Sequence, residues 1–162
     1  MSISTDSPDR PLRSRREWMG ILARTSRDQL GAQLAAALGG APLPPFDWLR
    51  APDIGLAMVR GRIGGTGDAF NLGEVTVTRA TLRLRLDDAN GPVGFAVHRG
   101  RDKERARLAA LADAMLQLPE FSARLQTQLL EPLAHVIETR RSEKEQQAAR
   151  TKVEFFTMVR GD

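Results

Sequence analysis

Apolar positions recur at helical spacing in two neighbouring segments near the N-terminus. In residues 15–25, "RREWMGILART", they fall three and four residues apart on one helix face. Ser26 then precedes "RDQLGAQLAAAL" and is a suitable N-cap, and Gly39 follows where a left-handed C-cap residue is expected. The pattern predicts a helical hairpin.

A proline-rich stretch follows, "APLPPFDWLRAPDIG", residues 41–55, with four of the nine prolines of the chain. Each proline removes a backbone donor and fixes φ, so we expect an ordered surface loop. The rings of Phe46 and Trp48 are predicted to anchor it by packing inward.

Three further segments have the pattern of strands. Residues 54–63, "IGLAMVRGRI", are apolar at both parities as far as Arg60, which is typical of a central strand covered on both faces. Residues 74–86 form a second strand, and the turn "DDANGP" leads to a third, "VGFAVHR", residues 93–99. Together they predict a small antiparallel sheet.

The second of these strands changes its apolar face. Val75 and Val77 are apolar at odd positions, whereas Leu82 and Leu84 are apolar at even ones. Because side chains alternate strictly along a strand, two arrangements are possible. Either a β-bulge lies near residues 78–80, or the first half is covered on both faces and the second half on one.

The C-terminal third is predicted to be helical. Asp102 can cap a helix over 103–117, and Pro119 begins another that Pro132 should kink. After Ile137 the apolar stripe ends, and charged pairs three and four residues apart predict an exposed helical rod. The chain closes with the apolar segment "VEFFTMVRGD", which either docks on a partner or adds a strand to the chain's own sheet.

Length and composition are those of a single globular domain, and the predicted helices and antiparallel sheet place it in the α+β class. The chain has 162 residues, 41% apolar and 27% charged, with no apolar run long enough to span a membrane. We expect a flexible N-terminus over 1–14, a single domain over 15–152, and an apolar tail over 153–162. The first sixteen residues lack the apolar core of a secretory signal, so a soluble cytoplasmic protein is predicted.

The residue types narrow the chemistry. The chain has no cysteine and two histidines, so thiolate metal sites and iron-sulfur ligation by this chain are excluded and no metal is expected. The formal charge is +4, and aromatic residues make up only 5%. Since binders of nucleic acid usually combine a basic face with aromatic stacking, no nucleic-acid partner is expected.

The stretch "VRGRIGGTGDAFNLGEVTVTR", residues 59–79, is rich in glycine but matches no nucleotide-binding motif. The spacing and the missing Lys-Ser/Thr pair exclude a P-loop, and a connection between two strands offers no helix N-terminus for a dinucleotide. The glycines either serve only the turn or let a partner or phosphate approach closely. Arg60, Arg62 and Arg79 are the candidate substrate-binding residues, since guanidinium groups bind phosphate with paired donors.

Two surfaces are candidate partner interfaces, the glycine-rich connection and the apolar tail. Neither contains paired carboxylates or a nucleophile beside a base, so no catalytic residue is predicted. The candidate interface residues are Gly61, Gly64, Gly65, Thr66, Gly67, Asn71, Val153, Phe155, Phe156 and Met158.

Three segments together resemble one family. They are "APDIGLAMVRGRIGGTGDAFNLGEVTVTRATLRL", "GRDKERARLAALADAMLQ" and "KVEFFTMVRG", with "REWMGILAR" and "FDWLRAP" in support. They look like PhnG, the G subunits of the bacterial carbon-phosphorus lyase system, over most of residues 16–161. Two positions depart from the family pattern: Ala80 stands where cysteine is frequent, and "VHR" carries charge where an apolar residue is usual.

The resemblance implies a subunit of a core complex with H, I and J subunits, functionally linked to an L subunit. Such a complex transfers ribose 5-triphosphate from ATP to methylphosphonate and releases adenine. It implies no cofactor in this chain: ATP is a substrate of the complex, and the iron-sulfur cluster and S-adenosylmethionine belong to the J subunit. When isolated, the chain is a candidate for a homodimer or a tail swap.

Overall fold

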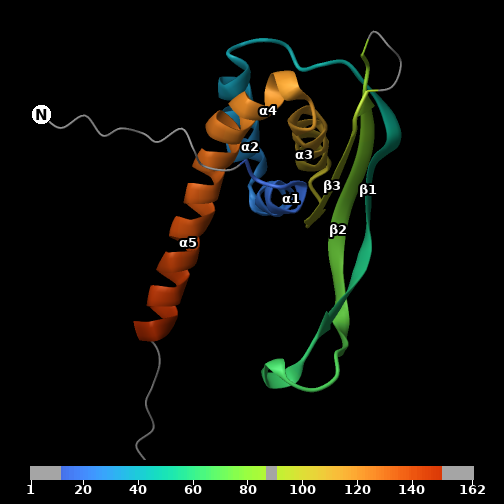
Figure 1. Cartoon of the computed structure of the whole chain (residues 1–162). Helices are drawn as coiled ribbons and strands as arrows, with labels where there is room; N and C mark the ends of the chain where they lie inside the picture. The colour runs from blue at the N-terminus through green and yellow to red at the C-terminus, as the bar shows by residue number, and fades with distance from the viewer. Residues whose placement is uncertain (1–11, 87–90, 151–162) are drawn as a thin grey trace, which may run out of the picture.

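A three-stranded antiparallel sheet and a layer of helices on one of its faces make up the computed structural model, which describes residues 12–86 and 91–150 (Figure 1). The strands are β1 (Phe46–Gly61), β2 (Phe70–Leu84) and β3 (Val93–Arg99). The helices are α1 (Arg15–Arg24), α2 (Arg27–Leu38), α3 (Lys103–Leu116), α4 (Pro119–Leu125) and α5 (Glu131–Arg150), with a short 3-10 turn, η1, at Ile63–Gly65 and a π-helical turn, η2, at Gln126–Leu130. The α+β class is confirmed.

The predicted helical hairpin is confirmed as α1 and α2. Ser14 and Glu17 form a capping box at the start of α1, and the Ser26 side chain accepts a hydrogen bond from the Gln29 backbone N–H at the start of α2. Gly39 ends α2 in the left-handed region at φ 62°. Local capping therefore fixes both helices where the sequence indicates.

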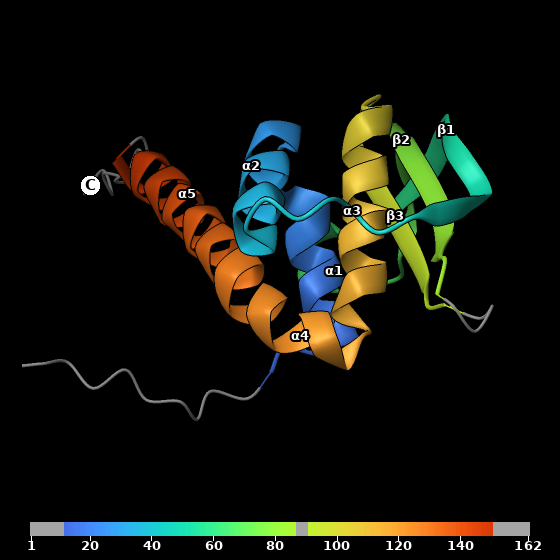
Figure 2. The same cartoon turned by 90° about the horizontal axis from the view of Figure 1, so that it is seen from above.

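The helices are layered beside the sheet. Viewed from above, α3 lies against the strands, α1 and α2 lie beyond α3, and α5 is outermost (Figure 2). The core joins these layers through fully buried leucines on the strands and helices, among them Leu30, Leu82, Leu111 and Leu129. The single hydrophobic cluster that results supports α1 to α5 and the upper part of the sheet.

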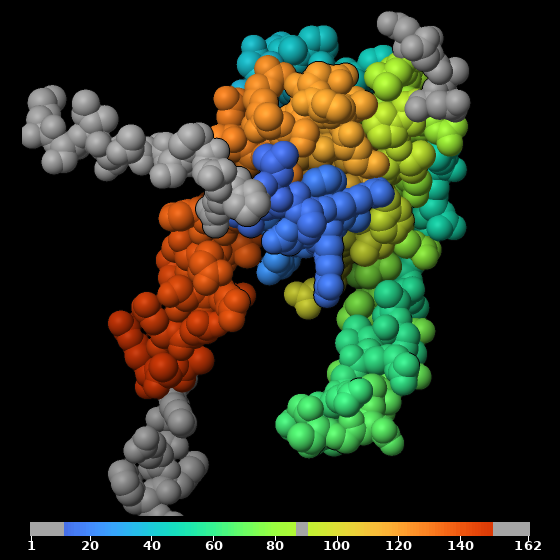
Figure 3. All heavy atoms as spheres, in the orientation of Figure 1, coloured from blue at the N-terminus to red at the C-terminus, as the bar shows by residue number. Residues whose placement is uncertain are grey.

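The strand order is β1-β2-β3, so β1 is an edge strand and β2 is central. The prediction of a central strand at 54–63 was therefore wrong. Ile54, Leu56 and Met58 are 43%, 60% and 50% exposed, because β1 and β2 extend past the helices as a two-stranded ribbon. In Figure 1 this ribbon projects on the same side as the free half of α5, and Figure 3 shows open space between them.

The predicted proline-rich loop is largely strand. β1 begins at Phe46, and its first residues pair with β2 at Phe46↔Leu84 and Trp48↔Leu82. Phe46 packs against the core and makes an edge-to-face contact with Trp48, at 4.9 Å between ring centroids, but Trp48 is 38% exposed. Only Phe46 anchors the segment as expected. An edge strand tolerates Pro52 because it needs donors on one side only.

The face change along β2 has a different cause from either alternative. β2 pairs with β3 without interruption from Val77 to Arg83, so no bulge lies at 78–80 of β2. Two of the irregularities place an extra residue in β1, between Trp48 and Arg50 and between Arg50 and Asp53. The third skips Leu72 of β2, between the pairs Val59↔Gly73 and Arg60↔Asn71, well before residues 78–80. Residues 70–74 of β2 are exposed because they belong to the projecting ribbon, and Val77 and Thr78 are both buried where the helices begin to cover the sheet. From there on only even positions are buried.

The C-terminal helices follow the prediction closely. Asp102 caps α3 by accepting from the Arg105 N–H, and Pro119 is the first residue of α4. The distortion expected at Pro132 appears just before it, as the π-helical turn η2. Proline cannot supply the N–H that a regular helix needs at that point.

Beyond Ile137 every residue of α5 is exposed, as predicted for the rod. Arg13, in the segment predicted to be a flexible N-terminus, is bonded to the fold: its backbone N–H donates to Gln126 Oε1 at 3.1 Å, and Gln126 Nε2 donates to the Arg13 carbonyl at 3.0 Å. The predicted interface residues Val153, Phe155, Phe156 and Met158, and most of the predicted flexible N-terminus, lie outside the described residues.

Candidate functional site

Arg79 lies far along the ribbon from Arg60 and Arg62, the other two candidate substrate-binding arginines. Arg79 is in the middle of β2 and donates to Asp53 at 3.0 Å. Arg60 pairs in register with Asn71 near the far end and donates to the Ala69 carbonyl at 3.2 Å. Eight positions of β2 separate Asn71 from Arg79, or about 27 Å at roughly 3.4 Å per residue. The structure does not bring them together in one site.

The glycine-rich connection forms the tip of the ribbon. Gly64, Gly65 and Gly67 have φ of 63°, 76° and 82°, a region that side-chain-bearing residues rarely adopt. Residues 62–68, which include Arg62, are exposed. The turn therefore requires glycine for its own backbone geometry. The second role considered for these glycines, close approach by a partner, stays a prediction.

One face of the ribbon is apolar and uncovered. Ile54 pairs with Thr78, and both lie on the face that the helices cover further along. Leu56 and Met58 continue this face beyond the helices, because alternate residues of a strand point the same way. Phe70 and Leu72 are exposed near the tip of the ribbon. We name Ile54, Leu56 and Met58 the ribbon face.

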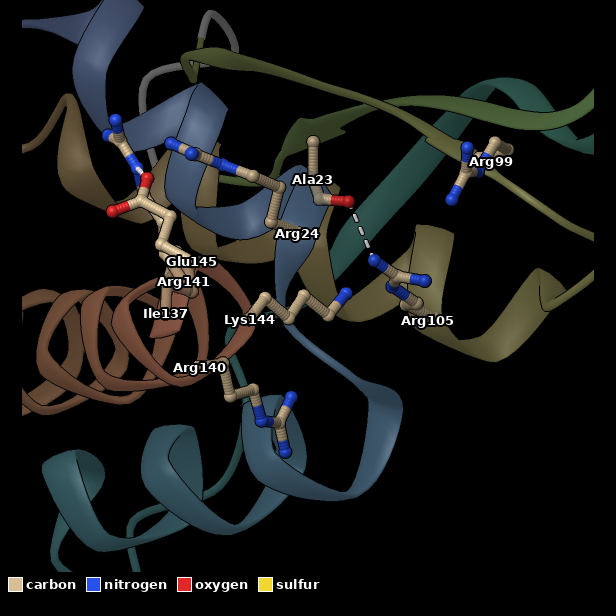
Figure 4. Close-up of a pocket in the computed structure, with 9 residues that line it drawn as sticks. All are labelled: Ala23, Arg24, Arg99, Arg105, Ile137, Arg140, Arg141, Lys144 and Glu145. Atoms are coloured by element: carbon tan, nitrogen blue, oxygen red, sulfur yellow. Dashed lines mark hydrogen bonds and ion pairs between the residues drawn. The ribbon is translucent and has the colours of Figure 1, made fainter. Parts of the chain in front are cut away.

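A basic cleft lies on the other arm of the molecule, where α5 passes the C-terminal end of α1. It has a volume of about 630 Å³ (Figure 4). The end of β3 and the first turns of α3 complete its walls. The residues that line it are Ala23, Arg24, Arg99, Arg105, Ile137, Arg140, Arg141, Lys144 and Glu145.

Arg105 is the most constrained cation of the cleft. Its Nη2 donates to the Ala23 carbonyl at the end of α1, at 2.6 Å, which Figure 4 draws as a dashed line. Its Nε is buried without a hydrogen-bond partner among the described residues. Burial lowers the pKa of the Arg105 guanidinium, and the Asp102 charge opposes that shift. The group stays charged, and part of its hydrogen-bonding capacity is unused.

The one carboxylate of the cleft is already engaged. Glu145 accepts from Arg141 Nε at 2.8 Å, and this bond raises the pKa of Arg141. Within residues 12–86 and 91–150, Arg24, Arg99, Arg140 and Lys144 make no ion pair. The cleft therefore presents a concentrated positive charge suited to an anionic ligand.

Chemically, the cleft can bind and orient an anion, and its described lining contains no histidine. His98, the nearer histidine in sequence, is buried, and its two ring nitrogens lie 3.1 and 2.8 Å from the backbone oxygens of Arg99 and Asp102. His135 is exposed on α5. No three metal-ligating side chains gather in the part of the chain that the structure describes.

The cleft is not apparent from the sequence. Arg140, Arg141 and Lys144 are close in sequence on one helix, and their pattern predicts only an exposed helical rod. The partners that turn them into a cleft, Arg24 and Arg99, come from segments more than 40 residues away. A search for basic residues three and four apart on α5 would have found half of it.

Comparison with known proteins decides the family. The model of the family "Phosphonate metabolism protein PhnG" matches residues 13–161. The chain belongs to the PhnG family. It is 42% identical, over 162 residues, to "Alpha-D-ribose 1-methylphosphonate 5-triphosphate synthase subunit PhnG" of Rhizobium meliloti (strain 1021), covering all of this chain and 99% of that relative. The resemblance stated from the sequence motifs is thereby confirmed.

One of the two departures from the family pattern lies in the core. Ala80, where the family pattern often has cysteine, is fully buried in this PhnG family member, so a packing residue occupies the position here.

None of the helices among the described residues is long and apolar enough to cross a membrane.

Proposed function

We propose that this chain is an accessory subunit of an alpha-D-ribose 1-methylphosphonate 5-triphosphate synthase. The observation that carries the proposal is the 42% identity over the full length to a subunit with that name. In the reaction expected for the complex, a phosphonate replaces adenine at the ribose C1 of ATP. The proposal gives the chain a place in phosphonate catabolism as part of a larger assembly.

The chain's role in this proposal is non-catalytic. ATP is the substrate of the complex, and the iron-sulfur cluster and S-adenosylmethionine belong to another subunit. The absence of cysteine from the whole sequence supports the latter, because the cluster needs thiolate ligands. The lining of the basic cleft supports the non-catalytic role, because its described residues offer arginine and lysine side chains but no histidine.

The ribbon face is the proposed docking surface for the partner subunits, with the H, I and J subunits as its expected neighbours and a functional link to the L subunit. Leu56 and Met58 are half or more exposed, although an edge strand with apolar side chains promotes aggregation unless something covers it. β1 also has an unpaired edge to which a partner strand can add. The cytoplasm remains the expected location of the assembly.

The test is co-purification from cells grown without phosphate. A tagged full-length chain should elute in a stoichiometric assembly that contains the I and J subunits. The double variant Leu56→Glu/Met58→Glu should remain folded and elute without them. Phe95→Glu/Val97→Glu alters two exposed apolar residues of β3 and serves as the matched control, which should still assemble. Normal assembly of the ribbon variant would refute docking through this face.

The alternative from the sequence, that Arg60, Arg62 or Arg79 contacts the triphosphate or phosphonate, has a separate test. Alanine variants at these positions should assemble and lose synthase turnover if the alternative holds. Because Arg79 is held by Asp53, Arg60 and Arg62 at the ribbon tip are the two to change first. Unchanged turnover in Arg60→Ala/Arg62→Ala would remove the tip from consideration.

A further inference from the structure

We propose that the basic cleft binds the triphosphate group of a substrate or product of the synthase. The identity of the ligand rests on the proposed function. The location of the binding site rests on the geometry of the cleft. The proposal assigns a ligand-binding role to Arg24, Arg99, Arg105, Arg140 and Lys144, which the sequence had left unassigned.

The first support is convergence. Arg24 comes from the last turn of α1, Arg99 from the end of β3, Arg105 from the first turn of α3, and Arg140 and Lys144 from α5. All five line one hollow, and Figure 4 shows them reaching it from different elements. Its volume of about 630 Å³ lies within the range of about 300 to 1,000 Å³ typical of small-molecule sites. A surface that only keeps a protein soluble has no reason to gather cations from four elements.

The second support is the charge balance. Among the described residues, the cleft has six cations against one carboxylate, and that carboxylate is bonded to Arg141. The chain as a whole has a formal charge of only +4, so the cleft concentrates more positive charge than the entire molecule has in excess. Like charges this close repel each other, and an anion in the hollow would relieve the repulsion.

The third support is the fixed guanidinium of Arg105. Its Nη2 donates to the Ala23 carbonyl at 2.6 Å, which fixes the orientation of the guanidinium plane at the wall of the cleft. A phosphate oxygen is the acceptor that suits a fixed guanidinium, because the two form paired, charge-assisted hydrogen bonds.

The described lining favours a small oligophosphate over a macromolecule. Among the described residues of the lining, Ala23 and Ile137 are the only apolar ones and none is aromatic, so this lining offers no stacking surface of the kind that single-stranded nucleic acid uses. A nucleic-acid backbone would need cations along a stripe, whereas these cations line one hollow. A triphosphate carries three linked anionic groups in one compact unit and matches such a hollow in charge.

The experiment is a calorimetric titration of the full-length chain, and of the co-purified complex, with inorganic tripolyphosphate and with ATP. Arg140→Ala/Lys144→Ala removes two cleft cations that make no ion pair in the described residues, and should weaken tripolyphosphate binding about tenfold or more. Arg83→Ala/Arg124→Ala removes the same charge from two exposed positions outside the cleft and should leave the affinity within about twofold. Circular dichroism checks that both variants fold.

The outcomes are distinct. Selective loss in the cleft variant supports the proposal. No binding of tripolyphosphate to either preparation, equal weakening in both variants, or tighter binding of a single-stranded oligonucleotide or an oligoglutamate peptide overturns it. If the chain still co-purifies with the I and J subunits while tripolyphosphate fails to bind, the ligand inference alone is lost. Failure to co-purify is the separate result that would overturn the proposed function.

Discussion

The Asp113 carboxylate on α3 is fully buried and accepts from the Arg15 guanidinium on α1, with Nη2 2.7 Å from Oδ2 and Nε 3.1 Å from Oδ1. The same carboxylate accepts from Trp18 Nε1 at 2.8 Å and from the Phe95 backbone N–H at 2.9 Å. The bond to Asp113 raises the pKa of Arg15, while burial opposes the increase. One side chain thus joins α1, α3 and β3, and with them the walls of the basic cleft.

Asp113→Ala should lower the free energy of unfolding by about 3 kcal/mol or more. The Trp18 and Phe95 donors would be left without an acceptor inside the protein, at about 1–3 kcal/mol each. Arg15 is 49% exposed along its side chain, so water can solvate it after the change. Urea denaturation followed by tryptophan fluorescence measures the difference. Arg141→Ala removes a pair exposed on α5 and should have little effect; a similar loss in both variants would contradict the assignment.

Gly94→Ala should destabilise the packing of β3 on α3 by about 1–3 kcal/mol or more. A Cβ at Gly94 would lie 2.8 Å from the Ala114 Cβ and would also collide with the Ala110 carbonyl oxygen. The backbone of α3 cannot yield as a flexible side chain would. Thermal unfolding of the full-length chain measures the loss.

Gly31→Ala is the matched control, because its new methyl group would meet only Leu108 Cδ1, at 3.6 Å. In the middle of α2 alanine should be neutral or stabilising by up to about 1 kcal/mol. A loss as large as that of Gly94→Ala would show that close approach to α3 is not the cause.

Acid should weaken the fold through carboxylates whose pKa values are lowered. Hydrogen bonds from Arg107 lower the pKa of Glu104, and those from Arg85 lower the pKa of Asp47. Their ordinary values are 4.5 and 3.8. Since the folded values are lower, the stabilisation is fully present above the ordinary values and is lost as the pH falls through the folded ones. Glu104→Gln/Asp47→Asn should therefore flatten the dependence of the urea midpoint on pH below about 5. An unchanged slope would contradict this.

Leu56→Lys should change the free energy of unfolding by no more than about 0.5 kcal/mol, because the side chain is 60% exposed. Leu82→Ala, at a fully buried position of β2, should cost about 2–5 kcal/mol. Chemical denaturation of both variants tests whether the ribbon face contributes to the isolated fold. A large loss for Leu56→Lys would mean that the ribbon face is core rather than a surface for a partner.

Local signals predicted most of the helices and strands. Ser26, Gly39, Asp102 and Pro119 each act through the chain within four residues of themselves, and the structure uses all four as expected. Strand 93–99 was also predicted correctly, since its alternation matches a sheet covered on one face. Such features depend on neighbours in sequence and are visible there.

The errors concern relations between distant segments. An apolar run at 54–63 indicates burial, yet Leu56 is exposed because β1 is an edge strand and the helices end before reaching it. The three candidate arginines share one stretch of sequence, but the length of β2 separates Arg79 from Arg60 and Arg62 at the ribbon tip. Arg24, Arg105 and Arg140 are scattered in sequence but line one cleft.

The sequence by itself determined the family, the helix boundaries and the absence of thiol chemistry, because motifs, caps and composition are properties of the chain. Tertiary structure alone decided that the ribbon face is left uncovered and that cations from four elements meet around one hollow. Both depend on how far β1, β2 and α5 project beyond the packed core. That projection depends on contacts between segments distant in sequence, so no local pattern of residues encodes it.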